Sequence, residues 1–402
     1  MPDSSKADLK FLPPKRNPLL TRLIQSIAYL VVYLVYKIRV IIDEDDLVKV
    51  KAIADHRVVY LPNHSTLDDG LVMFVFSAGI GQLFHYVVAY EAFQGVIGKL
   101  MQRVGAYSIR RGVGDRYSIV QTLEILQQPQ CKLVIFPEGG CSYQNDTVMP
   151  FRSGAIELSF KAIDKLFKHN DVIPDFYLVP VSLKYVYPNA TGTQLEQALS
   201  RLEKALSLKP AQSDHYLRLR EIATQVLKNL EAEYHQIPSN STNLNLRIKQ
   251  LKQRMLNYCE KKLELASLSQ IPERDRVYRI QSVLSSLADS AKKPNLNYEH
   301  IYQTTVRLLN FDAIYDGYVA EKPTPERYFA TIDRLEREIF KIDRPKLKGR
   351  RQAIIKIGTL INLKDHWQVE PNNSVKPQSY SRQQVIDNLT QAAQQEVQAY
   401  LN

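Results

Sequence analysis

The stretch VVYLPNHSTLDDGLVMFVFS, residues 58–77, decides the fold class of this chain. A short β-rich run at Val58–Leu61 leads through a polar turn to an apolar segment, Asp69–Ser77, which we predict to be helical. The same alternation continues to about residue 185. Further strands are predicted at His85–Ala89, Leu133–Phe136 and Phe176–Val181, and further helices at Gln94–Val104, Tyr117–Gln127 and Ser153–Lys168. Strands separated by helices predict an α/β domain, with a mostly parallel sheet flanked by helices.

The chain beyond residue 190 has a different pattern. Residues 191 to about 343 are almost entirely helical in pattern, and several stretches are amphipathic. A strand-like segment returns at Gln352–Gly358 and Thr359–Leu363, and a polar stretch, Glu370–Ser379, leads to a final helix at about Arg382–Leu401. A lone strand cannot satisfy its backbone groups, so we expect this one to join the first sheet. The helical region is then a large insertion.

The N-terminal part contains an uncharged run, Leu23–Tyr36, with Arg22 before it and Lys37 and Arg39 after it. The run is too short to cross a bilayer, which needs about 20 residues. Its tyrosines have amphipathic rings of the kind found at lipid head groups. We predict a helix that lies in one membrane leaflet. The alternative is a buried core helix of the same length.

These patterns predict four regions. They are an N-terminal tail with a membrane-associating helix (1–45), an α/β domain (46–190), a helical insertion (191–345), and a return strand with a C-terminal helix (346–402). The basic stretch Lys346–Arg351, just before the return strand, is expected to meet either anionic head groups or solvent.

The composition limits the classes of partner and cofactor. The formal net charge of +11 favours acidic partners, such as anionic lipid head groups, phosphorylated substrates or acidic carrier proteins. No zinc-finger spacing or RNA-binding signature is present, so no nucleic acid partner is predicted. The three cysteines are widely spaced and fit neither a disulfide framework nor a zinc pattern, so no metal site is predicted.

The turn after the first strand carries the candidate chemistry. His64 and an acid five residues later, Asp69, can meet around a strand-to-helix turn. The acid would hold one ring nitrogen protonated and leave the other free as a base. Asp68 is a second candidate for this orienting role, or it could flank the helix start. Without a G-x-S-x-G nucleophile motif, the base would act directly on a hydroxyl.

In isolation, a histidine near an aspartate is better explained as a capped turn. Three further motifs follow, however: Gly105–Gly112 (GAYSIRRG), Phe136–Gly139 (FPEG) and Val179–Val181 (VPV). Together with Asn63, His64 and Asp69, they resemble, in type and order, the four sequence blocks of the glycerolipid acyltransferase family of 1-acylglycerol-3-phosphate and glycerol-3-phosphate type. The resemblance covers roughly residues 20–188 and, more loosely, 352–363.

The resemblance implies a role for each matching residue. It makes His64 the general base and Asp69 the residue that orients it. It places an acceptor phosphate on Arg111 with Arg110 beside it, and it gives Glu138 and Gly139 a part in shaping the acceptor site. Asn63, in the first block, is counted with the substrate-binding residues.

The third block departs from the usual bacterial form. Gly140 and Cys141 follow Gly139, where bacterial lysophosphatidate acyltransferases have Thr-Arg. The segment looks more like the eukaryotic-type branch of glycerol-phosphate and lysophosphatidylcholine acyltransferases. Arg152 could supply the missing positive charge, and Cys141 is explained by this variant better than by thiol catalysis.

The function implied is the transfer of a fatty acyl group from acyl-CoA or acyl-ACP to the hydroxyl of glycerol 3-phosphate or a lysophospholipid, on the cytoplasmic face of a membrane. No cofactor beyond the thioester donor is expected. The alternatives are a lipid-binding or scaffold protein on an acyltransferase frame, and a hydrolase in which water replaces the acceptor. The sequence predicts neither the oligomeric state nor the role of the insertion, which could cover the active site, bind membrane, contact acyl carrier protein, mediate self-association or simply pack on the domain.

Overall fold

The computed structural model describes residues 11–112, 114–209, 213–236, 243–266, 270–290, 296–367 and 381–402. The chain divides into two compact units. The first, here called the sheet unit, comprises Phe11–Ile109, Asp115–Val186 and Arg351–Asn402. The second, the helical unit, contains Arg110–Gly114 and Tyr187–Arg350. The predicted polar stretch Glu370–Ser379 lies outside the described residues.

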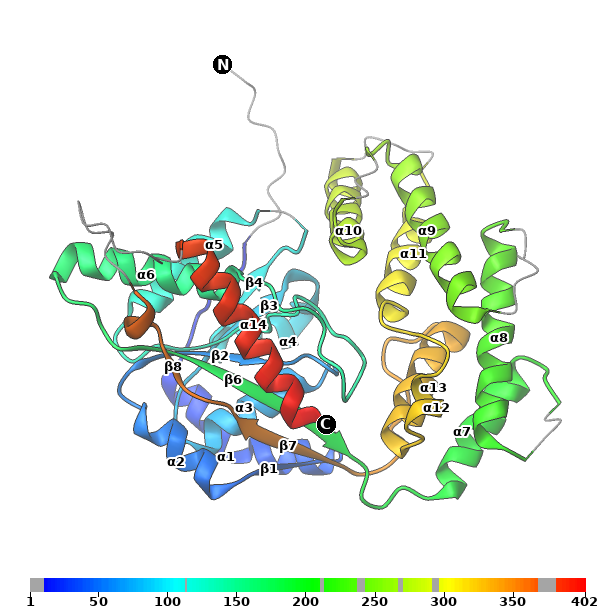
Figure 1. Cartoon of the computed structure of the whole chain (residues 1–402), viewed down its shortest axis with the longest axis horizontal. Helices are drawn as coiled ribbons and strands as arrows, with labels where there is room; N and C mark the ends of the chain where they lie inside the picture. Colours follow the sequence, from blue (N-terminus) through cyan, green and yellow to red (C-terminus); the bar gives the residue numbers. More distant parts are fainter. Residues whose placement is uncertain are drawn as a thin grey trace. The chain divides into compact units, whose positions relative to one another are not determined.

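The sheet unit is built on an eight-stranded sheet of order β1-β7-β6-β2-β5-β3-β4, and β8 pairs with β6 outside this path (Figure 1). The strands are β1 (Ile38–Ile42), β2 (Arg57–Pro62), β3 (His85–Ala89), β4 (Ala106–Ile109), β5 (Lys132–Val134), β6 (Phe176–Val186), β7 (Arg351–Ile357) and β8 (Ile361–Asn362). Among the described strands, β6 is antiparallel to β7 and β8, and the other pairings are parallel. The predicted α/β fold with a mostly parallel sheet is confirmed.

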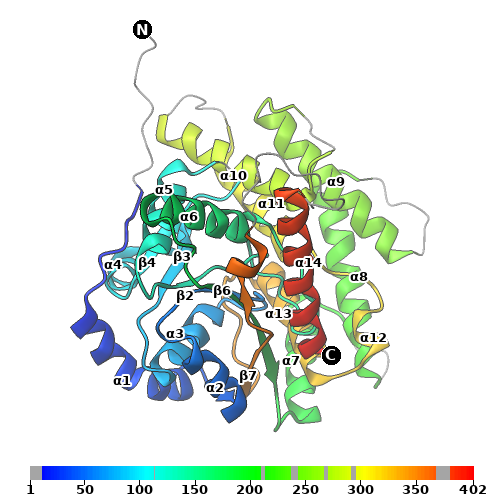
Figure 2. The same cartoon turned by 60° about the vertical axis from the view of Figure 1, so that its left-hand side comes forward.

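Helices cover both faces of this sheet, so its central strands are apolar throughout. Val58 and Tyr60 of β2 pack into the core that contains α1 and α3, whereas Val59 and Leu61 pack toward α5, α6 and α14 (Figures 1 and 2). Successive residues of a strand point to opposite faces, which accounts for this division. The helices are α1 (Pro18–Leu34), α2 (Glu44–Ala52), α3 (Asp69–Gly79), α4 (Gly95–Arg103), α5 (Arg116–Gln127), α6 (Gly154–Asn170) and α14 (Arg382–Leu401).

Several elements differ from the sequence prediction. β1, α2 and β4 were not predicted, although all three are part of the sheet unit. β6 continues five residues past the predicted end at Val181, because Val181–Val186 pairs with β7, which returns from a distant part of the chain. β5 ends at Val134, two residues before the predicted end, and the chain then turns through Pro137.

The N-terminal helix α1 buries a face that includes two polar residues, Thr21 and Gln25. Its buried residues are Thr21, Gln25, Ala28 and Val32. Gln25 Nε2 donates to Ser77 Oγ at 2.9 Å and to the Gln82 carbonyl at 2.8 Å, so the polar side chains are satisfied within the protein. The larger apolar side chains of α1 are exposed instead. Of the described helices, none is long and apolar enough to span a bilayer.

The helical unit has its own apolar core, which includes Leu199, Ile222, Leu256 and Ile332. Its helices are α7 (Gly192–Ala205), α8 (His215–Glu233), α9 (Leu244–Lys262), α10 (Glu273–Ser290), α11 (Tyr298–Asn310), α12 (Tyr318–Glu321) and α13 (Pro325–Phe340). Buried Arg–Glu pairs join consecutive helices: Arg218–Glu203, Arg247–Glu231 and Arg276–Glu260. Burial without a partner would be costly for each of these charges, so the pairs constrain how the helices align.

Candidate active site

The predicted catalytic residues lie at the carboxyl edge of the parallel strands. β2 pairs in parallel with both β5 and β6, so the loops that follow β2 and β5 leave the sheet at the same edge. His64 follows β2, and Phe136–Gly139 follows β5. Sites in open α/β sheets form at this edge.

His64 and Asp69 are in direct contact. Nδ1 of His64 lies 2.9 Å from Oδ2 of Asp69, across the turn that begins α3. The Asp69 side chain is fully buried, whereas the His64 side chain is 21% exposed. With Asp69 as an acceptor, Nδ1 carries the proton and Nε2 is the nitrogen left to accept one. This is the arrangement that general base catalysis requires.

Three further bonds fix the Asp69 carboxylate. The backbone N–H of Thr66 donates to Oδ2 at 2.9 Å, and the Thr66 hydroxyl donates to Oδ1 at 3.1 Å. The Tyr185 hydroxyl donates to Oδ1 at 2.6 Å. Burial, and next the Asp69 carboxylate, raise the pKa of the Tyr185 hydroxyl well above its usual range, so Tyr185 remains a donor. Together these bonds hold the Asp69 carboxylate in one orientation.

Asp68 is held by a different partner. Its Oδ2 accepts from Nη2 of Arg351 at 2.7 Å, and both side chains are nine-tenths buried. The Arg351 guanidinium also lies 5.3 Å from the centroid of the Tyr185 ring. Of the two candidate orienters, the structure therefore brings Asp69 to the histidine and gives Asp68 to Arg351.

Glu138 holds two backbone segments together. Its Oε1 accepts the His64 N–H at 2.6 Å, and its Oε2 accepts the Met149 N–H at 3.0 Å. The Ser142 N–H donates to the His64 carbonyl at 2.7 Å, and the His64 ring lies 4.5 Å from that of Phe136. The contacts show Glu138 supporting the loop that carries His64, and its predicted role in the acceptor site stays a prediction.

Gly139 and Arg152 lie against each other. Gly139 has φ +70°, and a Cβ built there would lie 2.7 Å from Nε of Arg152. The glycine is therefore required both by its backbone conformation and by the guanidinium packed over it. Arg152 is exposed, and its backbone N–H donates to the Pro137 carbonyl at 2.9 Å. The structure thus places the cation predicted to replace the missing arginine next to the Phe136–Gly139 loop.

Asn63 is a structural bridge in this conformation. Its side chain donates to the Leu183 carbonyl at 3.1 Å and accepts the Leu183 N–H at 2.7 Å. Asn145 makes the same pair of bonds with Tyr185. Both amides continue the hydrogen bonding of β6 beyond Val181, where its pairing with β2 ends. The substrate contact predicted for Asn63 stays a prediction.

Arg110 and Arg111 follow β4 directly, but they belong to the helical unit. The Arg111 guanidinium lies over the Tyr278 ring of α10, 4.5 Å from its centroid, and its Nη1 donates to the Tyr278 hydroxyl at 3.3 Å. A contact with acceptor phosphate, predicted for both arginines, stays a prediction.

Three residues of the site were not predicted from the sequence: Tyr185, Arg351 and Asn145. Tyr185 lies beyond the predicted end of its strand, and Arg351 was assigned to a basic stretch facing lipid or solvent. That assignment is wrong for two of its residues: Arg351 pairs with Asp68, and Lys348 pairs with Asp333 and Glu336 at 2.8 and 2.7 Å. An arginine that opens a return strand, in a sheet whose edge carries two adjacent aspartates, is a signal that could have found the Asp68 contact.

Within the described residues, no group of three or more His, Cys, Asp or Glu side chains could hold a metal ion. No curated protein matches the chain. A protein-family model described as Acyltransferase matches residues 40–184, which contain His64, Asp69 and Glu138. This match supports a general acyltransferase function for that part of the chain.

Proposed function

We propose that this protein transfers a fatty acyl group from an acyl thioester to the hydroxyl of a glycerolipid precursor. The observation that carries the proposal is the 2.9 Å contact between His64 Nδ1 and the buried, three-fold bonded carboxylate of Asp69. The family match of residues 40–184 supports the reaction class. The four sequence blocks support the choice of acceptor class.

The proposed reaction is a single direct transfer. Nε2 of His64 removes the proton of the acceptor hydroxyl as that oxygen attacks the thioester carbonyl carbon. Asp69 stabilises the imidazolium that forms. The C–S bond then breaks, and the thiolate of CoA or of acyl carrier protein leaves and receives the proton from His64. The products are an oxygen ester and a free thiol.

Arg152 is the cation we propose for the acceptor phosphate in the sheet unit. It is exposed and packs over Gly139, in the loop that follows β5. A guanidinium can bind a phosphate through two parallel N–H bonds. Arg110 and Arg111 are proposed as further phosphate contacts on the family resemblance.

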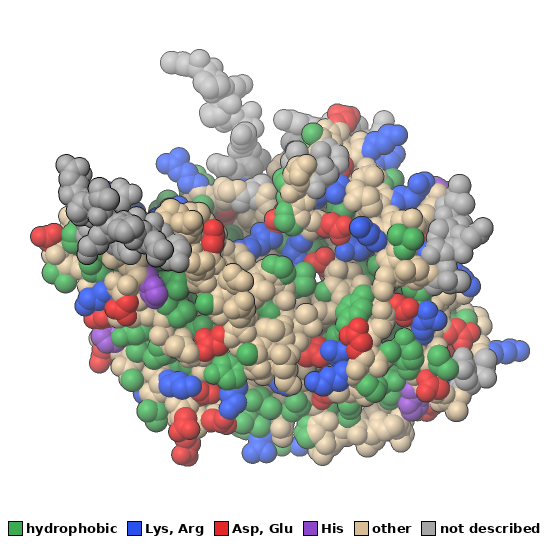
Figure 3. Space-filling view, in the orientation of Figure 1, with side chains coloured by type: hydrophobic (Ala, Val, Ile, Leu, Met, Phe, Trp, Pro, Cys, Tyr) green, Lys and Arg blue, Asp and Glu red, His purple; other side chains and the backbone are tan. Residues whose placement is uncertain are grey.

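We also propose that α1 attaches the sheet unit to a membrane surface. The lipid substrates would then reach the active site from that membrane. Leu23, Ile27 and Leu30 of α1 are 64%, 52% and 56% exposed, whereas its polar Thr21 and Gln25 are buried. A helix that faces water would instead expose its polar side chains and bury its apolar ones. Hydrophobic side chains lie among charged ones on the surface of the region where Figure 1 places α1 and α2 (Figure 3). This pattern fits a helix that lies in the head-group layer.

α4 is a second helix with exposed apolar side chains, and its end lies beside the start of α1. The Thr21 hydroxyl donates to the Arg103 carbonyl at 3.3 Å, and the Asn17 N–H donates to it at 2.9 Å, so α1 begins beside the end of α4. Val96 and Ile97 of α4 are among the most exposed apolar side chains of the described residues. Basic residues, Arg22, Lys37 and Arg39, flank the uncharged run of α1. Apolar side chains beside basic ones favour binding to the anionic cytoplasmic face of a membrane.

A matched assay of wild type, His64→Ala and His169→Ala tests the proposal. Each protein is incubated in lipid vesicles with labelled acyl-CoA or acyl-ACP and with glycerol 3-phosphate, lysophosphatidate, lysophosphatidylcholine or a neutral alcohol. We expect ester formation by wild type and His169→Ala, which changes an exposed histidine on α6. We expect His64→Ala to be at least about a hundredfold slower.

The same assay distinguishes the proposed acyl transfer from the two alternative functions. Labelled free fatty acid in place of ester, lost in His64→Ala, would make the protein a hydrolase. Vesicle binding without turnover of any donor or acceptor would overturn the enzyme proposal and favour a lipid-binding or scaffold protein.

A further inference from the structure

The helical unit contains an apolar cavity of about 110 Å³, lined by α8, α9, α11, α13 and the segment that leads from α11 into α12. Its inner wall is formed by Leu227, Leu251, Met255 and Leu308, all of which are buried. Its outer part is lined by Tyr216, Ala223, Ile248 and Tyr315, which are partly exposed or exposed. Protein interiors are packed with few voids larger than a water molecule, so an apolar space of this size is a candidate ligand site.

Two cations of the wall, Arg220 and Lys252, are each paired with a carboxylate. Arg220 makes a two-point contact with Asp316, through Nε at 3.0 Å and Nη2 at 2.9 Å. Lys252 lies 2.7 Å from Glu273. Each of these two cations is therefore engaged by a carboxylate, which favours an apolar ligand over an ionic one.

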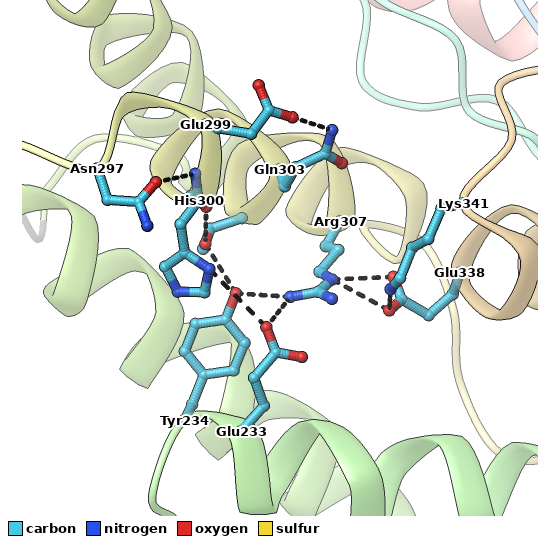
Figure 4. Close-up of polar contacts among 10 residues, drawn as sticks. Glu233, Tyr234, Asn297, Glu299, His300, Gln303, Arg307, Glu338 and Lys341 are labelled. Carbon is cyan, nitrogen blue, oxygen red and sulfur yellow. Dashed lines mark hydrogen bonds and ion pairs between the residues drawn. The ribbon is translucent and has the colours of Figure 1, made fainter.

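Arg307, which also borders the cavity, is directed into a separate polar cluster (Figure 4). Its Nε donates to both oxygens of Glu338, at 3.1 and 3.0 Å, and its Nη1 donates to Glu233 at 2.5 Å and to the Tyr234 hydroxyl at 3.0 Å. Burial lowers and these acidic partners raise the pKa of Arg307, and the net shift is upward. The Arg307 guanidinium is therefore held by Glu338, Glu233 and Tyr234. Most of the other lining side chains are apolar, which favours an apolar ligand.

The shape of the cavity selects a thin ligand. Its lining on α8 extends from Tyr216 to Leu230, which is about 21 Å along the axis at 1.5 Å per residue. The volume of about 110 Å³ is small beside a wall of this extent. A peptide helix, about 10 Å across, does not fit it. An unbranched hydrocarbon chain does, and Met255, a buried residue of the lining, has a flexible side chain that can adapt to such a chain.

We propose that the helical unit binds the hydrocarbon chain of a single-chain lipid in this cavity. The chain enters past Ala223 and Tyr315, its methyl end lies near Met255, and its polar end stays in solvent beside the Arg220–Asp316 pair. This site is lined wholly by the helical unit, and the proposal holds whether or not His64 catalyses acyl transfer.

The experiment measures displacement of a fluorescent linear fatty acid, cis-parinaric acid, from the full-length protein. n-Decanol and 1-adamantanol have ten carbons each but differ in shape. We expect n-decanol to displace the probe at concentrations at least tenfold lower than 1-adamantanol does. Decanoic acid and ten-carbon lysophosphatidylcholine then distinguish a free fatty acid from a lipid with a head group as the preferred source of the chain.

Variants locate the site. Ala223→Phe on α8 and Ile248→Phe on α9 each place a ring in the entrance, and we expect each to raise the Kd of the probe at least tenfold. Lys228→Phe adds the same ring at an exposed position of α8 outside the lining, and we expect a change of less than twofold, as for His64→Ala. Circular dichroism checks that the variants fold. Equal displacement by both alcohols, or unchanged probe binding in both entrance variants, would overturn the proposal.

Discussion

The Tyr185 hydroxyl donates to Asp69 Oδ1 at 2.6 Å, which links the end of β6 to the carboxylate behind His64. Arg351, the first residue of β7, holds the neighbouring Asp68. The chain leaves the sheet one residue after Tyr185 and re-enters it at Arg351. The residues that fix both aspartates therefore lie at the two points where the sheet is interrupted by the helical segment. The insertion can be long without disturbing the site, because its two ends are anchored by bonds to the site.

Tyr185→Phe removes one bond from Asp69 without opening a cavity. Asp69 keeps its contacts with Thr66 and His64, so we expect kcat to fall roughly tenfold, the scale of one lost bond to a charged group, while KM changes less than twofold. Steady-state kinetics with the acceptor found in the assay above measures both. The control is Tyr107→Phe, which removes a buried hydroxyl bonded to Thr122 at 2.7 Å. An equal fall in kcat in both variants would show a general loss of stability rather than a positioning role.

The two aspartates should respond differently to amidation. Asp69→Asn gives His64 a partner that no longer selects the Nδ1–H tautomer, so we expect kcat to fall at least a hundredfold. Asp68→Asn leaves that contact intact, and we expect its kcat to remain within tenfold of wild type. Kinetics of the two variants under saturating donor make the comparison. The reverse order would assign the orienting role to Asp68.

The Asp68–Arg351 pair should contribute more to stability than a surface pair. Both side chains are about nine-tenths buried, so Arg351→Gln leaves a buried carboxylate without its charged partner, and we expect a loss of about 3 kcal/mol in the free energy of unfolding. Lys356→Gln breaks the more exposed pair with Asp43, and we expect a loss below about 1 kcal/mol. Urea denaturation followed by circular dichroism gives both values. Similar losses would mean that solvent reaches the buried pair.

Local patterns in the sequence predicted the centre of the sheet unit well. β2, β3 and the helices α3, α5 and α14 were expected within two residues of their observed ends, because each is a short apolar run or an amphipathic stretch between clear turn signals. The contact between His64 and Asp69 also follows from local geometry, since five residues span one strand-to-helix turn.

Contacts between distant segments could not be predicted in this way. Tyr185 meets Asp69 across 116 residues and Arg351 meets Asp68 across 283, and no local pattern encodes such a pairing. β1 was missed because Ile38–Ile42 follows an apolar helix without a turn signal, and its neighbour β7 comes from the far end of the chain. The sequence pattern of α1 identified its apolar run but not which of its faces would be buried.

The exposed face of α1 should be required for membrane binding. Leu23→Glu combined with Leu30→Glu places two charges on that face, and we expect binding to anionic vesicles to weaken at least tenfold in a sedimentation assay. Val120→Glu is the control, since Val120 is also an exposed apolar residue but lies on α5, on the other face of the sheet. If the control weakens binding as much, the attachment is not specific to α1.

His85 should make the sheet unit sensitive to acid. Burial, and next the positive charge of Arg16, lower the pKa of His85 to about 4 from an ordinary value near 6.5. The unfolded chain then binds more protons than the folded one between these two values, so the free energy of unfolding falls as the pH drops from 6.5 to 4. The loss due to this one residue is on the order of 3 kcal/mol.

Urea denaturation measures this loss. It is followed by the fluorescence of Trp367, which is the single tryptophan and is part of the same unit. In His85→Gln, which keeps a donor for the Gly105 carbonyl, we expect the slope of stability against pH to decrease by about one proton over this range, whereas the exposed His169→Gln should leave it unchanged. An unchanged slope in His85→Gln would mean that the imidazole can be protonated in the folded protein, and that the core around β3 opens to water below pH 6.5.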